Sequence, residues 1–275
     1  MDKSISLYST AFNVIKCKFD YSDALTNFCN FAEEVVLSVN TSEDNTLEAI
    51  QQWKKDNKVE HLKILETNIS YESPWWDGLL KNNSLQNCTY ERCIQCDLDE
   101  RIIFCHKDRW LYYFDRLEKS KFKAYLVPSV EVIGDMKSIR WDKKKHLLFK
   151  WHLHLKNGTY RSPVKEARLL NGCIDILKSD TCELTDKDGN LIESPFLLPD
   201  FLVKKPNLQE YLKFLDEQGI FCYHLGYLDA SNRIFRNQSF WSRAWEVEAG
   251  RPIEIPMHES QLFYPTVEIN LPDYK

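Results

Sequence analysis

The sequence predicts an α/β fold in which a mostly parallel, Rossmann-like central sheet is followed by a β-rich half. The first hundred residues alternate short β-rich runs with amphipathic helical segments, which is the rhythm of βαβ units. From about Lys121 onward, β-rich pieces separated by turns replace this alternation. Because the chain has no internal repeat and no flexible linker, we expect one compact domain with two halves, residues 1–120 and 121–275.

Four strands and three helices are expected in the first half. The β-rich runs predict strands over Ile5–Tyr8, Glu34–Val39, His61–Leu65 and Arg92–Cys96. Apolar residues at helical spacing predict helices over Ser22–Phe31, Leu47–Asp56 and Trp75–Asn87. Asp44 or Asn45 is expected to cap the second of these helices.

The second half is expected to be mainly strands, with one late helix. Strands are predicted over Lys123–Ile133, Ser138–Trp141 and His146–Leu155, the last followed by an Asn157-Gly158 turn. After a Pro-containing stretch, Leu208–Gln218 has the pattern of an amphipathic helix, and an extended tail is expected beyond it.

Composition and charge exclude several classes of protein. Of the 275 residues, 43% are hydrophobic and 28% charged, which is typical of a globular protein with a sizeable core. With 36 Lys and Arg against 41 Asp and Glu, the net charge of -5 provides no positive field for nucleic acid. No apolar run reaches the roughly 20 residues of a membrane span, and the polar start Met1–Ser4 lacks a signal peptide's apolar region. We therefore expect a cytoplasmic protein with no nucleic-acid partner and no membrane span.

The nine cysteines are predicted to be free thiols. Their number is odd, and nothing in the sequence directs them to an oxidising compartment. Cys93 and Cys96 form a C-x-x-C, but no second such pair completes a zinc site. A zinc or redox role is therefore not assigned to them.

The acidic segment Asp97-Leu98-Asp99-Glu100 directly follows the fourth predicted strand. Ligands of open α/β sheets bind at the carboxyl ends of the strands, where two carboxylates can share a divalent cation with a diphosphate. Mg²⁺ or Mn²⁺ suits such hard oxygen ligands. The alternative is a solvated acidic turn without a ligand.

Two segments of the first half resemble family-two glycosyltransferases of the GT-A fold. Residues 35–48 resemble the V-D-x-G-S-T-D-G-T-x-E turn of that family, with Asn40 where the family usually has Asp and Asn45 where it usually has Gly. Residues 81–100 are similar, without a gap, to the family's A-R-N-x-A-L…G-D-W-I-L-x-L-D-A-D-E. The resemblance implies a GT-A fold, with nucleotide-sugar binding in residues 1–120 and acceptor binding in residues 121–275.

The resemblance also implies roles for individual residues. Asp97 would lie near the ribose and the metal ion, and Asp99 would be a metal ligand. The residues implied in nucleotide-sugar binding are Thr10, Ala11, Asn40, Thr41, Ser42, Asp44, Asn82, Asp97, Leu98 and Arg236.

Three segments of the second half resemble the later motifs of a subgroup, L-F-R-N, G-x-V-H-E and H-x-G-Y with a following R-N. They are Leu148–Trp151, Ser162–Glu166 with Lys165 in place of His, and His224–Tyr227 with Arg236. The resemblance implies that Glu166 is the catalytic base and His224 a further metal ligand.

Each of these residues has a structural alternative. Glu166 could form a surface ion pair with Lys165 or Arg168, which would leave Asp175, Asp180 or Asp200 as the base. His224 lies in an apolar stretch, where histidine is often a hydrogen-bonded core residue. Arg233 and Arg236 could bind a diphosphate or belong to a solvated basic face.

The predicted function is transfer of a sugar, with inversion, from a nucleotide-diphosphate donor to an acceptor hydroxyl, with Mn²⁺ or Mg²⁺ as cofactor. A UDP-sugar is the favoured donor, and a glycan, lipid-linked glycan or protein the acceptor. A different nucleotide-sugar or nucleotidyl enzyme is disfavoured, because no Gly-rich phosphate loop is present. The alternative from another class is an inactive homologue that binds glycans or acts as a scaffold.

Overall fold

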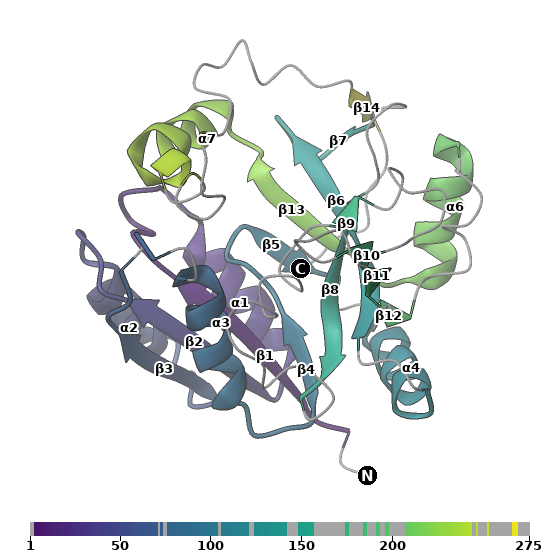
Figure 1. Cartoon of the computed structure of the whole chain (residues 1–275), viewed down its shortest axis with the longest axis horizontal. Helices are drawn as coiled ribbons and strands as arrows, with labels where there is room; N and C mark the ends of the chain where they lie inside the picture. Colours follow the sequence, from purple (N-terminus) through teal and green to yellow (C-terminus); the bar gives the residue numbers. More distant parts are fainter. Residues whose placement is uncertain are drawn as a thin grey trace.

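The computed structural model describes residues 3–70, 72–73, 76–103, 106–120, 124–141, 148–156, 174–175, 184–185, 191–192, 196–197, 207–243, 246, 252 and 266–268. Its first half is a four-stranded parallel sheet with helices between the strands (Figure 1). The strands are β1 (Ile5–Ala11), β2 (Glu34–Asn40), β3 (Leu62–Thr67) and β4 (Arg92–Gln95). They pair in the order β3-β2-β1-β4 with every pair parallel, so their carboxyl ends share one edge.

Helices cover both faces of this sheet. The three helices between the strands are α1 (Tyr21–Phe31), α2 (Thr46–Asp56) and α3 (Trp76–Gln86). Leu25 and Phe28 of α1 belong to the same buried cluster as Leu7 of β1. Leu85 of α3 belongs to a second cluster with Tyr8, the neighbouring residue of β1. Because successive side chains of a strand point to opposite faces, α1 and α3 lie on opposite sides of the sheet.

Antiparallel strands extend the sheet beyond β4. The next strands are β8 (Leu148–Leu155), antiparallel to β4, and β6 (Ala124–Ile133), antiparallel to β8. The far edge consists of β7 (Ser138–Arg140) and β14 (Thr266–Glu268). Short strands are also described: β9 (Ile174–Asp175) pairs with β8, β12 (Phe196–Leu197) pairs with β6, and β10 (Leu184–Thr185) pairs with β11 (Leu191–Ile192).

A strand late in the chain connects the two halves near the acidic segment. This strand, β13 (Cys222–Tyr227), runs parallel to β6 on one side. On its other side it is antiparallel to β5 (Glu100–Ile102), which begins directly after Asp99. The other helical elements among the described residues are α4 (Lys107–Glu118), α6 (Leu208–Gln218), α7 (Ala230–Arg236) and a π-helical turn, Asn237–Trp241.

The predicted α/β class with a largely parallel central sheet is confirmed. Six of the seven elements expected in the first half form within two residues of their predicted bounds, and β1 ends at Ala11, three residues beyond the predicted Tyr8. The helix at Leu208–Gln218 and the strands that begin near Lys123, Ser138 and His146 also form within two residues of their predicted bounds. The expectation of an extended tail after Gln218 was wrong, because β13, α7 and the π-helical turn come after that helix. The Asn157-Gly158 turn lies outside the described residues.

Two further sequence expectations concern cysteine chemistry and membranes. Six cysteines belong to the described residues, and all six are free thiols, as predicted. Cys105, Cys173 and Cys182 lie outside that part of the chain. Within the described ranges, no helix combines the length and the apolar character needed to cross a membrane.

Candidate functional site

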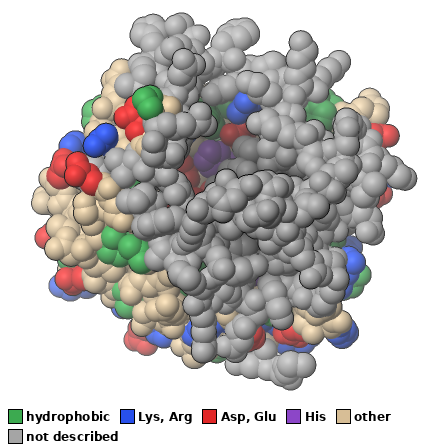
Figure 2. Space-filling view, in the orientation of Figure 1, with side chains coloured by type: hydrophobic (Ala, Val, Ile, Leu, Met, Phe, Trp, Pro, Cys, Tyr) green, Lys and Arg blue, Asp and Glu red, His purple; other side chains and the backbone are tan. Residues whose placement is uncertain are grey.

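The candidate site lies where β4 ends and β13 passes close to it (Figure 1). Figure 2 shows a histidine together with acidic and basic side chains near the centre of this face of the molecule. The turn after β4 is tied to β13, because the backbone N–H of Leu225 donates to the carbonyl of Asp99 at 2.7 Å. The chain therefore brings the acidic segment and the H-x-G-Y segment together, as their predicted common role requires.

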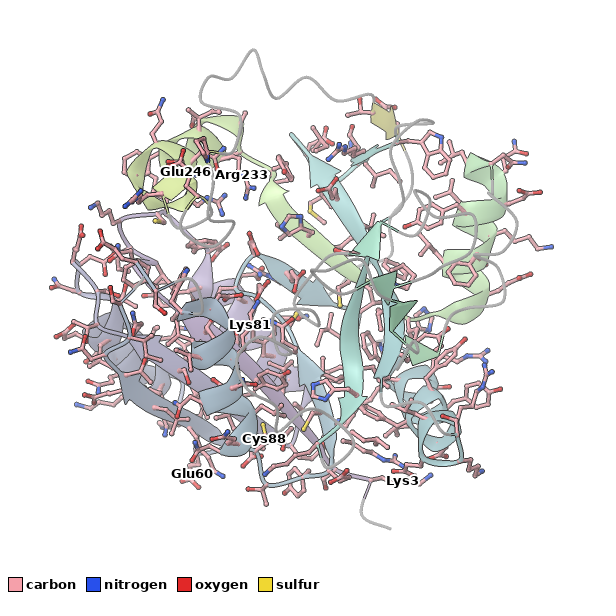
Figure 3. The ribbon with its side chains drawn as sticks, viewed as in Figure 1. Lys3, Glu60, Lys81, Cys88, Arg233 and Glu246 are labelled. Atoms are coloured by element: carbon pink, nitrogen blue, oxygen red, sulfur yellow. The ribbon has the colours of Figure 1, made fainter. Side chains whose placement is uncertain are left out.

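Asp97 is held in one orientation by three neighbours. Gln95 donates from Nε2 to its Oδ1 at 2.7 Å, and Lys81 of α3 lies 3.2 Å from the same oxygen. The Asp97 backbone N–H donates to Glu100 Oε2 at 2.8 Å, which closes the turn. The Lys81 side chain is only 10% exposed, and its ammonium also contacts Asp77 at 3.1 Å. A buried ammonium needs such acidic partners, so α3 supplies positive charge to this turn (Figure 3).

Asp99 lies between a histidine and an arginine. Its Oδ2 is 3.5 Å from His224 Nε2 and 3.6 Å from Arg236 Nη1. The three side chains are only 5–17% exposed. His224 is the direct neighbour of Glu100 across the β5·β13 pair, and this register carries the imidazole to Asp99.

Gly226 keeps the space in front of these two side chains open. A Cβ atom at this position would lie 2.8 Å from His224 Nε2, closer than real Cβ atoms come, and 3.0 Å from Asp99 Oδ2, tighter than most real Cβ contacts. A carboxylate oxygen and an imidazole nitrogen that face one open space are donors suited to Mn²⁺. This arrangement fits a divalent cation held by Asp99 and His224.

In the described part of the chain, no group of three or more His, Cys, Asp or Glu side chains is arranged as a metal site. Asp97 contacts Lys81 and Gln95, whereas Asp99 and His224 contact each other. The predicted ligand set Asp97, Asp99 and His224 therefore stays a prediction.

Glu131 lies on the other side of the His224 ring. Its Oε1 is 3.7 Å from His224 Nδ1, and its Oε2 accepts a hydrogen bond from Arg140 Nη1 at 2.8 Å. Burial by itself raises the pKa of Glu131, but the neighbouring His224 and Arg140 outweigh it and lower that pKa. The ring is thus flanked by the carboxylates of Glu131 and Asp99.

Arg236 is fixed by its surroundings on α7. Its Nη2 donates to the carbonyl of Gly226 at 3.2 Å, and its guanidinium lies over the Phe19 ring, 4.5 Å from the centroid. Burial lowers the pKa of Arg236, and the charge of Asp99 opposes this shift. A buried guanidinium beside Asp99 is placed to attract an anion that approaches the same space. Arg233, labelled in Figure 3 on the same helix, lies over Tyr227 at 4.7 Å.

The side chain of Asn40, at the end of β2, makes hydrogen bonds within the protein. Its Nδ2 donates to the carbonyl of Ile69 at 2.7 Å, and its Oδ1 accepts from the Ile69 backbone N–H at 2.8 Å. The same oxygen accepts from Thr67 Oγ1 at 3.2 Å. The amide thus binds the segment after β3, a pairing that the donor and acceptor of an amide permit. No hydrogen bond of this side chain to a nucleotide is needed to explain its presence.

The neighbouring polar residues join the turn after β2 to the turn after β1. Ser42 Oγ accepts from the Asn13 backbone N–H at 3.0 Å, and Asp44 accepts from the N–H groups of Lys16 and Thr46 at 2.7 and 3.0 Å. Asp44 thus caps α2, whereas Asn45, at the N-cap position, makes no side-chain cap bond. Thr41 Oγ1 donates to the carbonyl of Thr67 at 3.1 Å. Thr41, Ser42 and Asp44 therefore hold the strand-end loops together.

The other predicted site residues differ in exposure. Thr10 is partly exposed near the end of β1, whereas Ala11 and Leu98 are buried in the core. Asn82 is partly exposed on α3.

The candidates for the catalytic base lie largely outside the described residues. This holds for Glu166, Asp180 and Asp200, and for Asp175 only the strand β9 is described. The catalytic-base assignment therefore stays a prediction.

Sequence reasoning did not assign site roles to Lys81, Gln95, Glu131 or Gly226. Lys81 stands in the segment that resembles A-R-N-x-A-L, at the position of the basic residue, and this match could have pointed to a site role for it. Gly226 is the glycine of the H-x-G-Y segment. Glu131 has no local signal, because its proximity to His224 depends on the pairing of β6 with β13.

Comparisons with known proteins give remote structural similarities. No protein-family model matches the chain, and no curated protein matches it. The chain is similar to S. aureus TarS 1-349 in complex with UDP-GlcNAc at 18% identity and TM-score 0.36, covering 48% of this chain and 36% of that one. Against S. aureus TarS 1-349 in another crystal structure, the identity is 12% and the TM-score 0.42, covering 90% of this chain and 69% of that one. Against the mannosyltransferase PcManGT from Pyrobaculum calidifontis in complex with GDP-Man and Mn²⁺, the identity is 15% and the TM-score 0.43. This similarity covers 92% of this chain and 66% of the mannosyltransferase.

Proposed function

We propose that the chain is a divalent-metal-dependent glycosyltransferase that moves a sugar from a nucleotide-diphosphate donor to an acceptor hydroxyl with inversion. The observation that carries this proposal is the convergence of His224 and Arg236 on Asp99, where Asp99 and His224 face the space kept open by Gly226. The order of residues 81–100, which resembles the family-two motif, supports the same assignment.

The residues present suggest how a diphosphate would be bound. Asp99 and His224 would hold the cation, with Asp97 as the further predicted ligand near the ribose. A bound Mn²⁺ or Mg²⁺ would neutralise negative charge on the diphosphate as it leaves. Arg236 would donate to phosphate oxygens from its buried position, and Lys81 would compensate the charge of Asp97. The low exposure of these groups strengthens their electrostatic interactions with a bound anion.

The donor and acceptor belong to the proposal as well. Thr10, Ala11, Asn40, Thr41, Ser42, Asp44, Asn82 and Leu98 are proposed to surround the nucleoside and sugar. We favour a hexose on UDP as donor, with a glycan, lipid-linked glycan or protein as acceptor. UDP-GlcNAc and GDP-Man belong in the first panel of donors to be tested.

A charge-neutral substitution of Asp99 tests the metal site. Asp99→Asn keeps the size of the side chain but removes a charged oxygen ligand, so Mn²⁺-dependent binding of the nucleotide diphosphate should weaken at least tenfold, on the order of a lost metal-ligand contact. Calorimetric titration with UDP and GDP, each with Mn²⁺ and with EDTA, measures this. Asp56→Asn on the exposed side of α2 is the matched control. Unchanged affinity in folded Asp99→Asn would reject the assignment.

Glu166 is proposed as the base that takes the proton of the acceptor hydroxyl. Glu166→Gln should keep donor and metal binding but lower transfer by roughly two to four orders of magnitude, the usual contribution of general base catalysis. Near-normal transfer in that variant would assign the role to Asp175, Asp180 or Asp200.

The inactive homologue remains the second candidate function, and Asn40 is the observation that favours it. The amide that occupies the family's Asp position is bound to Ile69. A glycan-binding or scaffolding protein would hydrolyse no donor, and this outcome separates the two candidates.

A further inference from the structure

We propose that Glu131 is a positioning residue: its carboxylate, 3.7 Å from Nδ1 of His224, attracts the ring proton to that nitrogen and thereby fixes the ring with Nε2 toward Asp99. A role of this ring in holding a cation rests on the proposed function. The orientation and protonation of the ring do not depend on that function.

The register of β13 brings Glu131 and His224 together. His224 pairs with Glu131 of β6 on one side and with Glu100 of β5 on the other. Residues directly opposite each other on neighbouring strands project to the same face, so these three side chains form one row. Glu100 accepts a hydrogen bond from the backbone N–H of Asp97 and thus closes the acidic turn, the segment Asp97–Glu100. Glu131 is the carboxylate of this row that lies beside Nδ1 of His224.

The surroundings of the two ring nitrogens differ. Nδ1 is fully buried and faces Glu131 Oε1 at 3.7 Å, an electrostatic contact longer than a hydrogen bond. Nε2 faces Asp99 and the space kept open by Gly226. A neutral imidazole carries its proton on one nitrogen and a lone pair on the other. With the proton on Nδ1 and directed at a buried carboxylate, the lone pair is on Nε2 and faces the space where a cation would bind.

Arg140 holds Glu131 in this orientation. Its Nη1 donates to Oε2 at 2.8 Å and leaves Oε1 directed at His224. Glu131 is 8% exposed, so solvent does not compete effectively for either oxygen. Carboxylates that fix the tautomer of a metal-binding histidine typically change metal affinity by roughly 10- to 100-fold when they are removed. Glu131 is placed to have this effect on His224.

Long-range proton–nitrogen NMR of ¹⁵N-histidine-labelled protein tests the proposal directly. At a pH where the ring is neutral, wild-type His224 should carry its proton on Nδ1, and the His224→Gln variant identifies its signals. A wild-type ring with its proton on Nε2 would overturn the proposal, and this result does not depend on any variant folding.

Glu131→Ala gives the second readout. Once the acceptor beside Nδ1 is lost, Asp99 remains beside Nε2 and the proton should move to Nε2. The buried pair of Tyr8 and His154, with Nε2 2.9 Å from the hydroxyl, reports in the same spectrum whether the fold is intact. Glu34→Ala removes another buried glutamate, at the start of β2, and should leave the His224 signals unchanged. An unchanged tautomer in Glu131→Ala with intact His154 signals would also overturn the proposal.

Titration with Mn²⁺ alone separates this proposal from the proposed function. Paramagnetic broadening of the His224 signals should require about 10- to 100-fold more Mn²⁺ in Glu131→Ala than in the wild type. If Mn²⁺ broadens neither protein, the metal-dependent function fails while the tautomer measurement still decides the role of Glu131. Equal broadening of both proteins at the same Mn²⁺ concentration would count against that role.

Discussion

A single added methyl group at Gly226 would close the space between His224 and Asp99. The Cβ of Gly226→Ala would lie 2.8 Å from Nε2 and 3.0 Å from the carboxylate, so both side chains would have to move. We expect Mn²⁺ binding to weaken at least tenfold, on the scale expected when metal-orienting contacts are lost. Calorimetry of the folded variant measures this effect.

Gly134→Ala is an informative control for that substitution. Gly134 has a φ of +70° and no atom within 4 Å of an added Cβ. The substitution should lower the free energy of unfolding by about 1 kcal/mol because of backbone strain, and it should leave metal binding unchanged. If Gly226→Ala bound Mn²⁺ as well as Gly134→Ala, the open space would have no role in metal binding.

Glu34 should make the stability of the protein depend on acid pH. Burial by itself raises the pKa of Glu34, but hydrogen bonds from Lys63, Ser6 and Thr89 outweigh it and lower the pKa from 4.5 to about 2. Because the folded pKa is depressed, the stabilisation is complete above pH 4.5 and is lost as the pH falls toward 2. A shift of this size corresponds to about 3 kcal/mol.

Urea unfolding of wild type and Glu34→Gln between pH 3 and 7 checks this pH dependence. The difference in free energy of unfolding should be largest above pH 4.5 and shrink toward pH 3, whereas exposed Glu60→Gln should show little difference throughout. A difference between wild type and Glu34→Gln that grew on acidification would contradict the assigned cause.

At the scale of elements, the Asn40 amide connects the end of β2 to the segment after β3. In Asn40→Asp, the carboxylate could still accept from the Ile69 N–H but would face the Ile69 carbonyl without a donor. An unpaired carbonyl and a repelled carboxylate should destabilise the fold by roughly 1–3 kcal/mol. Thr41→Val removes only an exposed hydrogen bond, so it should lower the free energy of unfolding by less than Asn40→Asp does. Equal stabilities of Asn40→Asp and wild type in urea would show that the pairing contributes little.

Local sequence patterns predict most elements of the first half. The strands β1 and β2 can be recognised from their own apolar runs, and the helices α1 and α2 from their own apolar residues at helical spacing. The helix α4 was not predicted, although Trp110, Phe114 and Leu117 recur at helical spacing. The strand β13 was missed because Cys222–Tyr227 mixes polar and apolar residues, and pairing with both β5 and β6 stabilises it there.

At the scale of the whole molecule, the site depends on pairing between distant segments. The acidic turn could be predicted because the strand before it has a local signal, and the H-x-G-Y segment because of its resemblance to a family motif. The proximity of His224 to Asp99 is consistent with that interpretation. The contacts of Glu131 and Lys81 could not be predicted, since each requires the register or the helix packing of the folded chain.

Continuity of the sheet suggests that ligand binding should stabilise the entire fold. The acidic turn lies between β4 and β5, and β5 pairs with β13, which pairs with β6 of the second half. A ligand that binds only the folded state raises its stability by about 2.7 kcal/mol when present at 100 times its dissociation constant. A nucleotide diphosphate with Mn²⁺ should therefore raise the melting temperature in a single transition. Separate transitions, with only one shifted, would contradict this expectation.

Release of nucleoside diphosphate from a panel of nucleotide sugars tests the central claim most directly. We predict that at least one donor is hydrolysed slowly with Mn²⁺, that EDTA abolishes the release, and that Asp99→Asn reduces it at least tenfold. Binding of a donor without any release would favour the inactive homologue. Absence of release from every donor, with no change in melting temperature from any donor with Mn²⁺, would contradict the assignment of this site to nucleotide-sugar chemistry.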